Sequence, residues 1–275
     1  MMLNIRKISM LIIFCFFIPA FLPGCAGPDV KKQENLQSLS DYALETQARV
    51  RQRLAENPES TVAESLAVLS EVLNYADEVR ANPDKFSLPK IQEYRQRIDI
   101  INENIQMFRD LALKTDVSFP IGTYRFPDLS EEGRSQCREL ARKIIETAAG
   151  LSRRYPGYAI RITLKTVGYT DEVPVVSGPL EKTIRSNLKE PEAPAGDARR
   201  KQYNHVLSRF RAASVSTYMM EYLRREMPAN ITIRYVEKIV GNGENFPQKN
   251  PSFPYTAQDE RRRICIISPY IEIML

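Results

Sequence analysis

The sequence predicts an α+β protein in which helices pack on one face of a mixed sheet, preceded by an α-helical bundle or a coiled-coil spacer. Two observations carry this prediction. Residues 33–116 keep apolar side chains at three- and four-residue steps, a spacing typical of helices. From residue 117 onward, short β-branched stretches alternate with helical ones in the order β-α-β-α-β-β. This order is typical of helices that cover a sheet.

Residues 1–24 predict a secretory signal. Arg6 and Lys7 precede an apolar run at 8–18, which is too short for a good membrane-spanning helix. Residues 22–25 (LPGC) resemble the bacterial lipobox, Leu-x-Gly-Cys. That resemblance implies cleavage before Cys25, lipidation of Cys25, and a tether at 25–32 that holds the chain to a membrane. Ala26 then favours an outer-membrane lipoprotein that faces the periplasm.

Composition and charge exclude several classes of site. The hydrophobic share of 43% and the charged share of 27% are those of an ordinary folded protein. The 39 Lys and Arg residues nearly balance the 34 Asp and Glu residues, and no basic tract predicts nucleic-acid binding. With one histidine and no Cys-x-x-Cys motif, we expect no metal site and no cofactor. Cys15 leaves with the signal, and Cys137 and Cys265 can form either a disulfide or two buried thiols.

Residues 33–116 predict three helices, separated by breaks at 57–59 and 82–83. Thr61 and Glu64 have the spacing of a capping box, which would open the second helix. Short breaks favour an antiparallel bundle, in which the apolar stripes form the core. A self-associating coiled coil stays open because the third stripe is an unbroken a/d heptad: Ile91, Tyr94, Ile98, Ile101, Ile105, Phe108 and Ala112.

Residues 117–275 predict the sheet and its helices. We expect an irregular strand at 117–126 and a helix at 129–154. Residues 159–167 alternate apolar and charged side chains for most of their length, which predicts a half-buried strand. An insertion rich in Pro, Gly and charge follows at 172–202. The remaining elements are a helix at 203–227, strands at 231–236 and 264–273, and a turn-rich segment at 241–254.

Three separated motifs fall on these elements. Residues 167–171 (VGYTD) end a strand, and residues 204–212 (NHVLSRFRA) begin a helix. Residues 241–247 (GNGENFP) and 259–264 (DERRRI) frame the last turn and strand. Together, over roughly 117–273, they resemble the OmpA-like C-terminal domain family, which includes the peptidoglycan-associated lipoprotein and MotB. The resemblance implies non-covalent binding of the peptidoglycan stem peptide, so that the chain tethers the outer membrane to the cell wall.

The same resemblance gives ligand roles to the matching residues. Asp171 would hold the ammonium of a diaminopimelate residue and Arg211 its carboxylate, with Thr170, Asn204 and Leu207 beside them. A zwitterionic head group needs one anion and one forked cation, and Arg offers bidentate donors. Asn204, Leu207 and Arg211 have the spacing of one helix face. We expect Gly241 and Gly243 to be turn glycines.

Two features depart from the family. The insertion places about thirty residues where the family has a short loop, and Arg261 stands where Asn is common. The insertion and the helical region therefore keep an alternative open, an accessory lipoprotein of an envelope secretion or motility complex that acts through protein contacts. We expect no enzymatic activity. Ser186 and Lys189 have a Ser-x-x-Lys spacing, but the companion motifs of penicillin-binding enzymes are absent.

Overall fold

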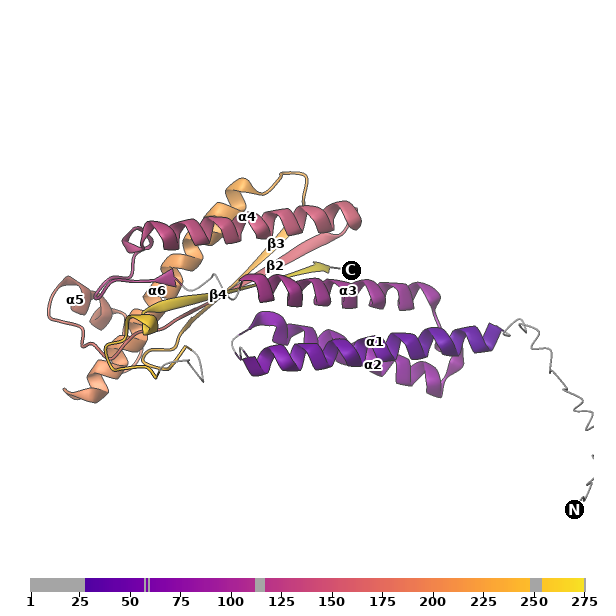
Figure 1. Cartoon of the computed structure of the whole chain (residues 1–275), viewed down its shortest axis with the longest axis horizontal. Coiled ribbons are helices and arrows are strands. Elements are labelled where there is room, and N and C mark those ends of the chain that lie inside the picture. The colour runs from indigo at the N-terminus through magenta and orange to yellow at the C-terminus, as the bar shows by residue number, and fades with distance from the viewer. Residues whose placement is uncertain (1–27, 57, 59, 112–116, 248–253, 275) are drawn as a thin grey trace, which may run out of the picture.

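The computed structural model describes residues 28–56, 58, 60–111, 117–247 and 254–274, and Figure 1 shows their arrangement. The predicted signal and the lipidation site at Cys25 lie outside the described residues. None of the described helices is long and apolar enough to cross a membrane.

The N-terminal region is an antiparallel bundle of α1 (Pro28–Glu56), α2 (Ser65–Ala81) and α3 (Leu88–Leu111). The third apolar stripe faces the bundle core, so the predicted helical region is confirmed. The apolar residues of the stripe pack against the other helices of the same chain. The side chain of Phe108 and all of Ala112 lie outside the described part. The core is made of Leu39, Ala43, Val50, Val62, Leu69, Val72, Ile91, Tyr94, Ile98 and Ile101.

The capping-box prediction is wrong. A 3₁₀ turn, η1 (Thr61–Glu64), precedes α2, and its N-cap is Ser60, whose Oγ accepts a hydrogen bond from Val62 N at 3.4 Å. Both side chains of the predicted box are bonded to the sheet instead. The Thr61 hydroxyl donates to the Pro269 carbonyl at 3.1 Å, and Glu64 pairs with Lys238 at 2.6 Å.

The sheet has the strand order β1-β4-β2-β3. Its strands are β1 (Val117–Ser118), β2 (Ala159–Gly168), β3 (Ile233–Gly241) and β4 (Ile264–Met274). β2 and β3 are parallel, and β4 is antiparallel to both β1 and β2, so the sheet is mixed as predicted. β1 is shorter than the expected strand because Pro120 has no N–H to pair and Gly122 turns the chain at φ +71°.

Helices α4 (Glu131–Arg154) and α6 (Asp197–Glu226) cover one face of the sheet. The expectation of helices on one face alone is incomplete, because the bundle packs on the other face. Tyr270 of β4 lies in the bundle core, and its hydroxyl accepts a hydrogen bond from Ser65 Oγ at 3.2 Å. Cys137 and Cys265 lie in the core beneath α4 and α6 as two buried free thiols.

The bundle also protects the edge of β4 that β1 leaves open. β1 pairs only with Ile264 and Cys265, so the later residues of β4 have one side without a strand. On that open side, the side chain of Asn104 in α3 pairs with the backbone of Ile271. Its Oδ1 accepts a hydrogen bond from Ile271 N at 2.9 Å, and its Nδ2 donates one to Ile271 O at 2.5 Å. A side-chain amide thus pairs with the backbone as a neighbouring strand would, which keeps the edge from pairing with another chain.

The insertion is more ordered than its composition predicts. It contains α5 (Pro179–Ser186), and α6 begins at Asp197, inside the segment expected to be a loop. Pro179 occupies the first helical position, where its missing N–H is not needed. The short helix is held by an apolar cluster with α6, formed by Leu180, Ile184, Leu188, Tyr203 and Leu207.

Candidate ligand-binding site at the end of the sheet

The predicted site residues gather where the parallel strands end. Gly168 at the end of β2 pairs with Gly241 at the end of β3 and with Cys265 at the start of β4. Thr170 and Asp171 follow β2 after one intervening residue, Tyr169. In open sheets of this kind, ligands bind beyond the carboxyl ends of parallel strands. This end of the sheet is therefore the expected position for a site.

Helix α6 is pressed against the same end. A Cβ on Gly168 would lie 2.0 Å from the Ser208 carbonyl oxygen, and one on Gly241 would lie 2.8 Å from Arg209 N. Gly243 has a φ of +55° and donates its N–H to Ser208 Oγ at 2.9 Å. Gly243 is thus a turn glycine as expected, whereas Gly241 serves the close approach of α6. On this helix the predicted inward face is buried: Asn204, Leu207, Ser208 and Arg211.

Asp171 is paired with an arginine that the sequence did not assign to the site. Its Oδ2 accepts a hydrogen bond from Arg263 Nη1 at 3.0 Å, and its side chain is 6% exposed. Arg263 immediately precedes β4, opposite the end of β2, and we expected its basic run only to stabilise the closing strand. The antiparallel register of β2 and β4 is the signal that would have identified this partner.

Arg211 has a different environment. It is 1% exposed, and its donors go to backbone carbonyls: Nε to Thr123 at 2.9 Å, Nη1 to Tyr169 at 3.3 Å and Nη2 to Pro120 at 3.3 Å. Its guanidinium lies over the Phe119 ring, 5.3 Å from the centroid. It makes no ion pair within the described chain. Desolvation lowers the pKa of Arg211 to about 10, and the nearby Cys265 and Asp171 oppose that shift.

Three buried polar atoms around Asp171 make no hydrogen bond within the described residues. They are the Oγ1 of Thr170, the Oδ1 of Asn204 and the Nε of Arg263. A buried polar group without a partner costs roughly 1–3 kcal/mol, so such groups commonly face a ligand or water. The Oδ1 of Asn204 can accept a hydrogen bond and the Nε of Arg263 can donate one. The Thr170 hydroxyl can do either.

Asn204 and Leu207 support the site from α6. The Asn204 amide Nδ2 donates to the carbonyls of Asp171 at 3.1 Å and Val173 at 3.2 Å, and to Glu244 Oε1 at 2.8 Å. It therefore fixes the chain as it leaves β2. Leu207 packs in the apolar cluster with the insertion and has no polar role.

An ion cluster joins the insertion to the turn after β3. Arg262 donates to Glu172 at 2.8 Å, and Arg200 pairs with Glu172 and with Glu244, each at 3.3 Å. The hydrogen bond from Arg262 is the largest cause that holds the pKa of Glu172 below its ordinary value, and Arg200 adds to it. This cluster holds the start of the insertion beside Asp171.

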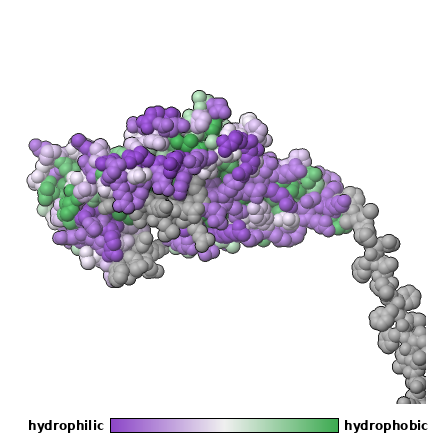
Figure 2. Space-filling model, turned by 45° about the horizontal axis from the view of Figure 1, so that its top comes forward, coloured by the Kyte–Doolittle hydropathy of each residue, from purple (hydrophilic) through white to green (hydrophobic). Residues whose placement is uncertain are grey.

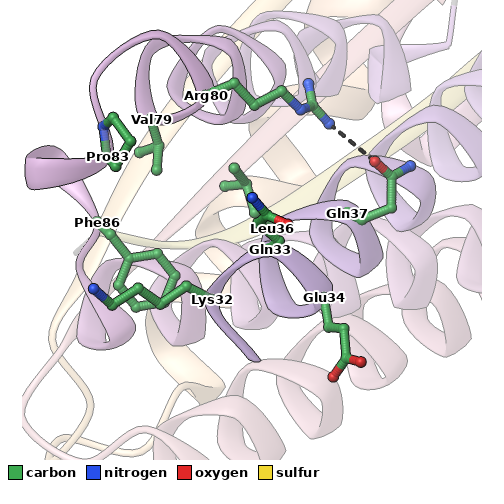
Figure 3. Close-up of a pocket in the computed structure, with 9 residues that line it drawn as sticks. All are labelled: Lys32, Gln33, Glu34, Leu36, Gln37, Val79, Arg80, Pro83 and Phe86. Atoms are coloured by element: carbon green, nitrogen blue, oxygen red, sulfur yellow. Dashed lines mark hydrogen bonds between the residues drawn. The ribbon is translucent and has the colours of Figure 1, made fainter. Parts of the chain in front are cut away.

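A separate cavity of about 750 Å³ lies at the far end of the bundle, between the start of α1 and the connection from α2 to α3 (Figure 3). Its apolar residues are Leu36, Val79, Pro83 and Phe86. Arg80 in its wall is already bonded to Asp77 at 2.6 Å and to Ser40 at 2.8 Å. The other charged residues that line it, Lys32 and Glu34, are exposed to solvent, so it is a weaker candidate than the sheet end.

Within the described chain, no cluster of three or more His, Cys, Asp or Glu residues could hold a metal ion. No protein-family model matches the chain, and neither does any curated protein. Among solved structures, the chain is similar to the periplasmic domain of Helicobacter pylori MotB, with 14% identity over 57% of this chain and 71% of that one. The TM-score of that superposition is 0.24.

Proposed function

We propose that this protein binds the stem peptide of peptidoglycan without covalent bonds and, through a lipid on Cys25, tethers the outer membrane to the cell wall. In this proposal the ligand is a zwitterionic diaminopimelate head group at the end of the sheet, and the protein catalyses no reaction. The motifs at 167–171, 204–212 and 259–264 support the assignment through their resemblance to OmpA-like domains.

The observation that carries the proposal is the buried guanidinium of Arg211, which has no carboxylate partner within the described residues. A buried cation without a counterion is costly, and such perturbed groups cluster at functional sites. Of the five N–H donors of Arg211, three meet backbone carbonyls, which leaves one on each terminal nitrogen. A ligand carboxylate is the group that would balance this charge.

The neighbouring atoms fit the other half of a zwitterion. The carboxylate of Asp171 and the Oδ1 of Asn204, which has no hydrogen-bond partner in the described residues, would accept hydrogen bonds from an ammonium. The Nε of Arg263, which makes no hydrogen bond in the described residues, is a further donor beside Asp171. Both charge types thus converge within one small region, as an amino-acid head group requires.

Binding would require one local movement. The carbonyls of Pro120 and Thr123 that cap Arg211 belong to a single turn, closed by a hydrogen bond from Thr123 N to Pro120 O at 3.3 Å. Gly122 at the corner of this turn has a positive φ, and Ile121 beside it is exposed. A ligand carboxylate would replace the two carbonyls when this turn shifts.

The arrangement of the chain also fits a tether. The start of α1 and the helix α5 lie at opposite ends of the described part of the molecule in Figure 1. The 29 residues of α1 span about 44 Å at 1.5 Å per residue. The anchor and the wall-binding site would therefore be separated by the length of the bundle.

The test is co-sedimentation of the chain with purified peptidoglycan sacculi. We expect the wild type to pellet, and Asp171→Asn and Arg211→Met to remain in solution while folded. Asp84→Asn and Arg95→Met in the bundle make the same charge changes on surface residues and should pellet like the wild type. A wild-type chain that stays in solution would refute wall binding and favour the accessory lipoprotein that acts through protein partners.

An enzymatic role has little support. Ser186 donates its hydroxyl to the Thr183 carbonyl at 2.9 Å at the end of α5, and no hydrogen bond joins it to Lys189 in the described chain. Turnover of purified muropeptides that disappears in Ser186→Ala would contradict the proposal.

A further inference from the structure

The backbone turn at residues 120–123 occupies the position that a ligand carboxylate would take at Arg211. The carbonyl oxygens of Thr123 and Pro120 accept hydrogen bonds from this side chain at 2.9 and 3.3 Å. Both acceptors are neutral, so they bind the guanidinium without balancing its charge. Hydrogen bonds from a guanidinium to a carboxylate are about twice as strong as neutral ones. The turn is therefore an internal competitor for the donors that a ligand would use.

The closed form of this turn depends on a glycine. Gly122 at its third position has a φ of +71°, and Thr123 donates its N–H to the Pro120 carbonyl at 3.3 Å, as in a type II turn. The Thr123 hydroxyl donates to the same carbonyl at 3.0 Å. A side chain at position 122 would meet no atom within 4 Å, so it would act on the turn through φ alone.

Both ends of the turn are fixed, which confines any movement to the turn itself. Before it, Phe119 is buried and donates its N–H to the Arg263 carbonyl at 2.8 Å. After it, the ring of Tyr124 lies 5.3 Å from the ring of Phe210. Between these ends, Ile121 is 61% exposed. The turn can therefore move outward into solvent while its two ends stay in place.

The insertion packs against the second of these ends. Tyr124 and Phe210 belong to an apolar cluster that includes Ile184 of α5 and Leu188 of the insertion. Figure 2 shows apolar groups at the end of the molecule where α5 lies in Figure 1, on a face that is otherwise mostly hydrophilic. The packing of the insertion thus reaches the residue next to Thr123, whose carbonyl belongs to the turn.

We propose that the turn at 120–123 is an autoinhibitory cap on Arg211, and that the insertion keeps the cap closed through Tyr124. This inference rests on the proposed function, because the carboxylate of the ligand is the group that displaces the cap. The apparent affinity is then the affinity of the open form reduced by the fraction of molecules that are open. The insertion sets this fraction without contacting the ligand.

The first test measures co-sedimentation of the full chain, kept in detergent, with purified sacculi. In Gly122→Val the side chain disfavours the closed turn, and we expect the dissociation constant to fall about tenfold. The matched control is Gly157→Val, in a turn of the same form away from the site. Gly157 has a φ of +88°, its Cβ would meet no atom within 4 Å, and Tyr158 donates its N–H to the Tyr155 carbonyl at 3.4 Å. This control should bind like the wild type.

Three further variants test the direction of the effect and the role of the insertion. Ile121→Pro favours the closed turn, because proline suits the second position, which Pro156 occupies in the control turn. It should raise the dissociation constant about threefold. Tyr124→Ala and Leu188→Ala loosen the packing of the insertion on the cap, and each should lower the dissociation constant about threefold.

A second readout does not depend on peptidoglycan. Phenylglyoxal modifies accessible arginine side chains, and peptide mass spectrometry gives its rate of reaction at Arg211. We expect this rate to rise about tenfold in Gly122→Val and to stay at the wild-type value in Gly157→Val.

The two readouts separate the cap from the proposed function. If the wild type does not sediment but Gly122→Val speeds the modification of Arg211, wall binding fails and the cap stands. If the wild type sediments and Gly122→Val binds no more tightly, or Gly157→Val shows the same gain, the cap is overturned. Wild-type affinity in both Tyr124→Ala and Leu188→Ala overturns the role of the insertion.

Discussion

Replacing Arg211 by Met should separate ligand binding from stability. Burial lowers the pKa of Arg211 from 12.5 to about 10, and each pKa unit equals about 1.36 kcal/mol, so the buried charge costs about 3 kcal/mol. Against this, the side chain makes three hydrogen bonds to carbonyls, each with a net contribution of about 0.5–1.5 kcal/mol. Met has a similar length and no charge, and the part-buried carbonyls of Thr123 and Pro120 can bind water once the guanidinium is gone, so the two contributions nearly cancel.

We therefore expect Arg211→Met to change the free energy of unfolding by less than about 2 kcal/mol in urea titrations. Binding to sacculi should fall by about a hundredfold or more, since a buried charge pair loses about 2–5 kcal/mol when one partner is removed. Two results would refute this reasoning. Wild-type sedimentation would remove Arg211 from the ligand site, and a stability loss above about 4 kcal/mol would make it a structural residue.

Three further measurements test the parts of the fold that hold the site. Gly168→Ala should lower the free energy of unfolding in urea by at least about 2 kcal/mol, because the new Cβ would lie 2.0 Å from the Ser208 carbonyl oxygen. In the control Gly150→Ala, in α4, the new Cβ meets no atom within 4 Å, and the variant should be more stable by about 0.5–1 kcal/mol. Asn104→Leu should cost about 2–4 kcal/mol, because it leaves the N–H and C=O of Ile271 buried without partners, and an unchanged unfolding curve would mean that the bundle does not protect β4. The pKa of Glu172 should be below 4.5 in a carboxyl NMR titration and return toward 4.5 in Arg262→Gln. Because the folded pKa is the lower one, this contact stabilises the fold above pH 4.5 and is lost as the pH falls through the folded value; an unchanged pKa in the variant would contradict the role of Arg262.

Periodicity allowed most elements to be predicted from local sequence. The three helical stripes follow from a repeat of 3.6 residues and the strand β2 from a repeat of 2, and neither repeat needs knowledge of distant partners. The insertion was the main error. Its Pro, Gly and charge content predicted a loop, but α5 and the first turns of α6 form because Ile184 and Tyr203 bury against each other. A short helix of this kind depends on tertiary packing and not on propensity.

For the candidate site, too, the sequence predicted some features and left others to the tertiary structure. The sequence by itself determined that Asp171 follows a strand, that Asn204, Leu207 and Arg211 share one helix face, and that Gly243 turns the chain. Only the tertiary structure decided that Asp171 pairs with Arg263, because strand register brings together residues 92 positions apart. It also decided that Arg211 has no carboxylate partner among the residues that the structure describes. It also decided that the bundle covers the second face of the sheet through Asn104 and Tyr270. The residue type determines which charge or hydrogen-bonding group a position carries. Which residue pairs with that group depends on long-range packing, which no local sequence pattern encodes.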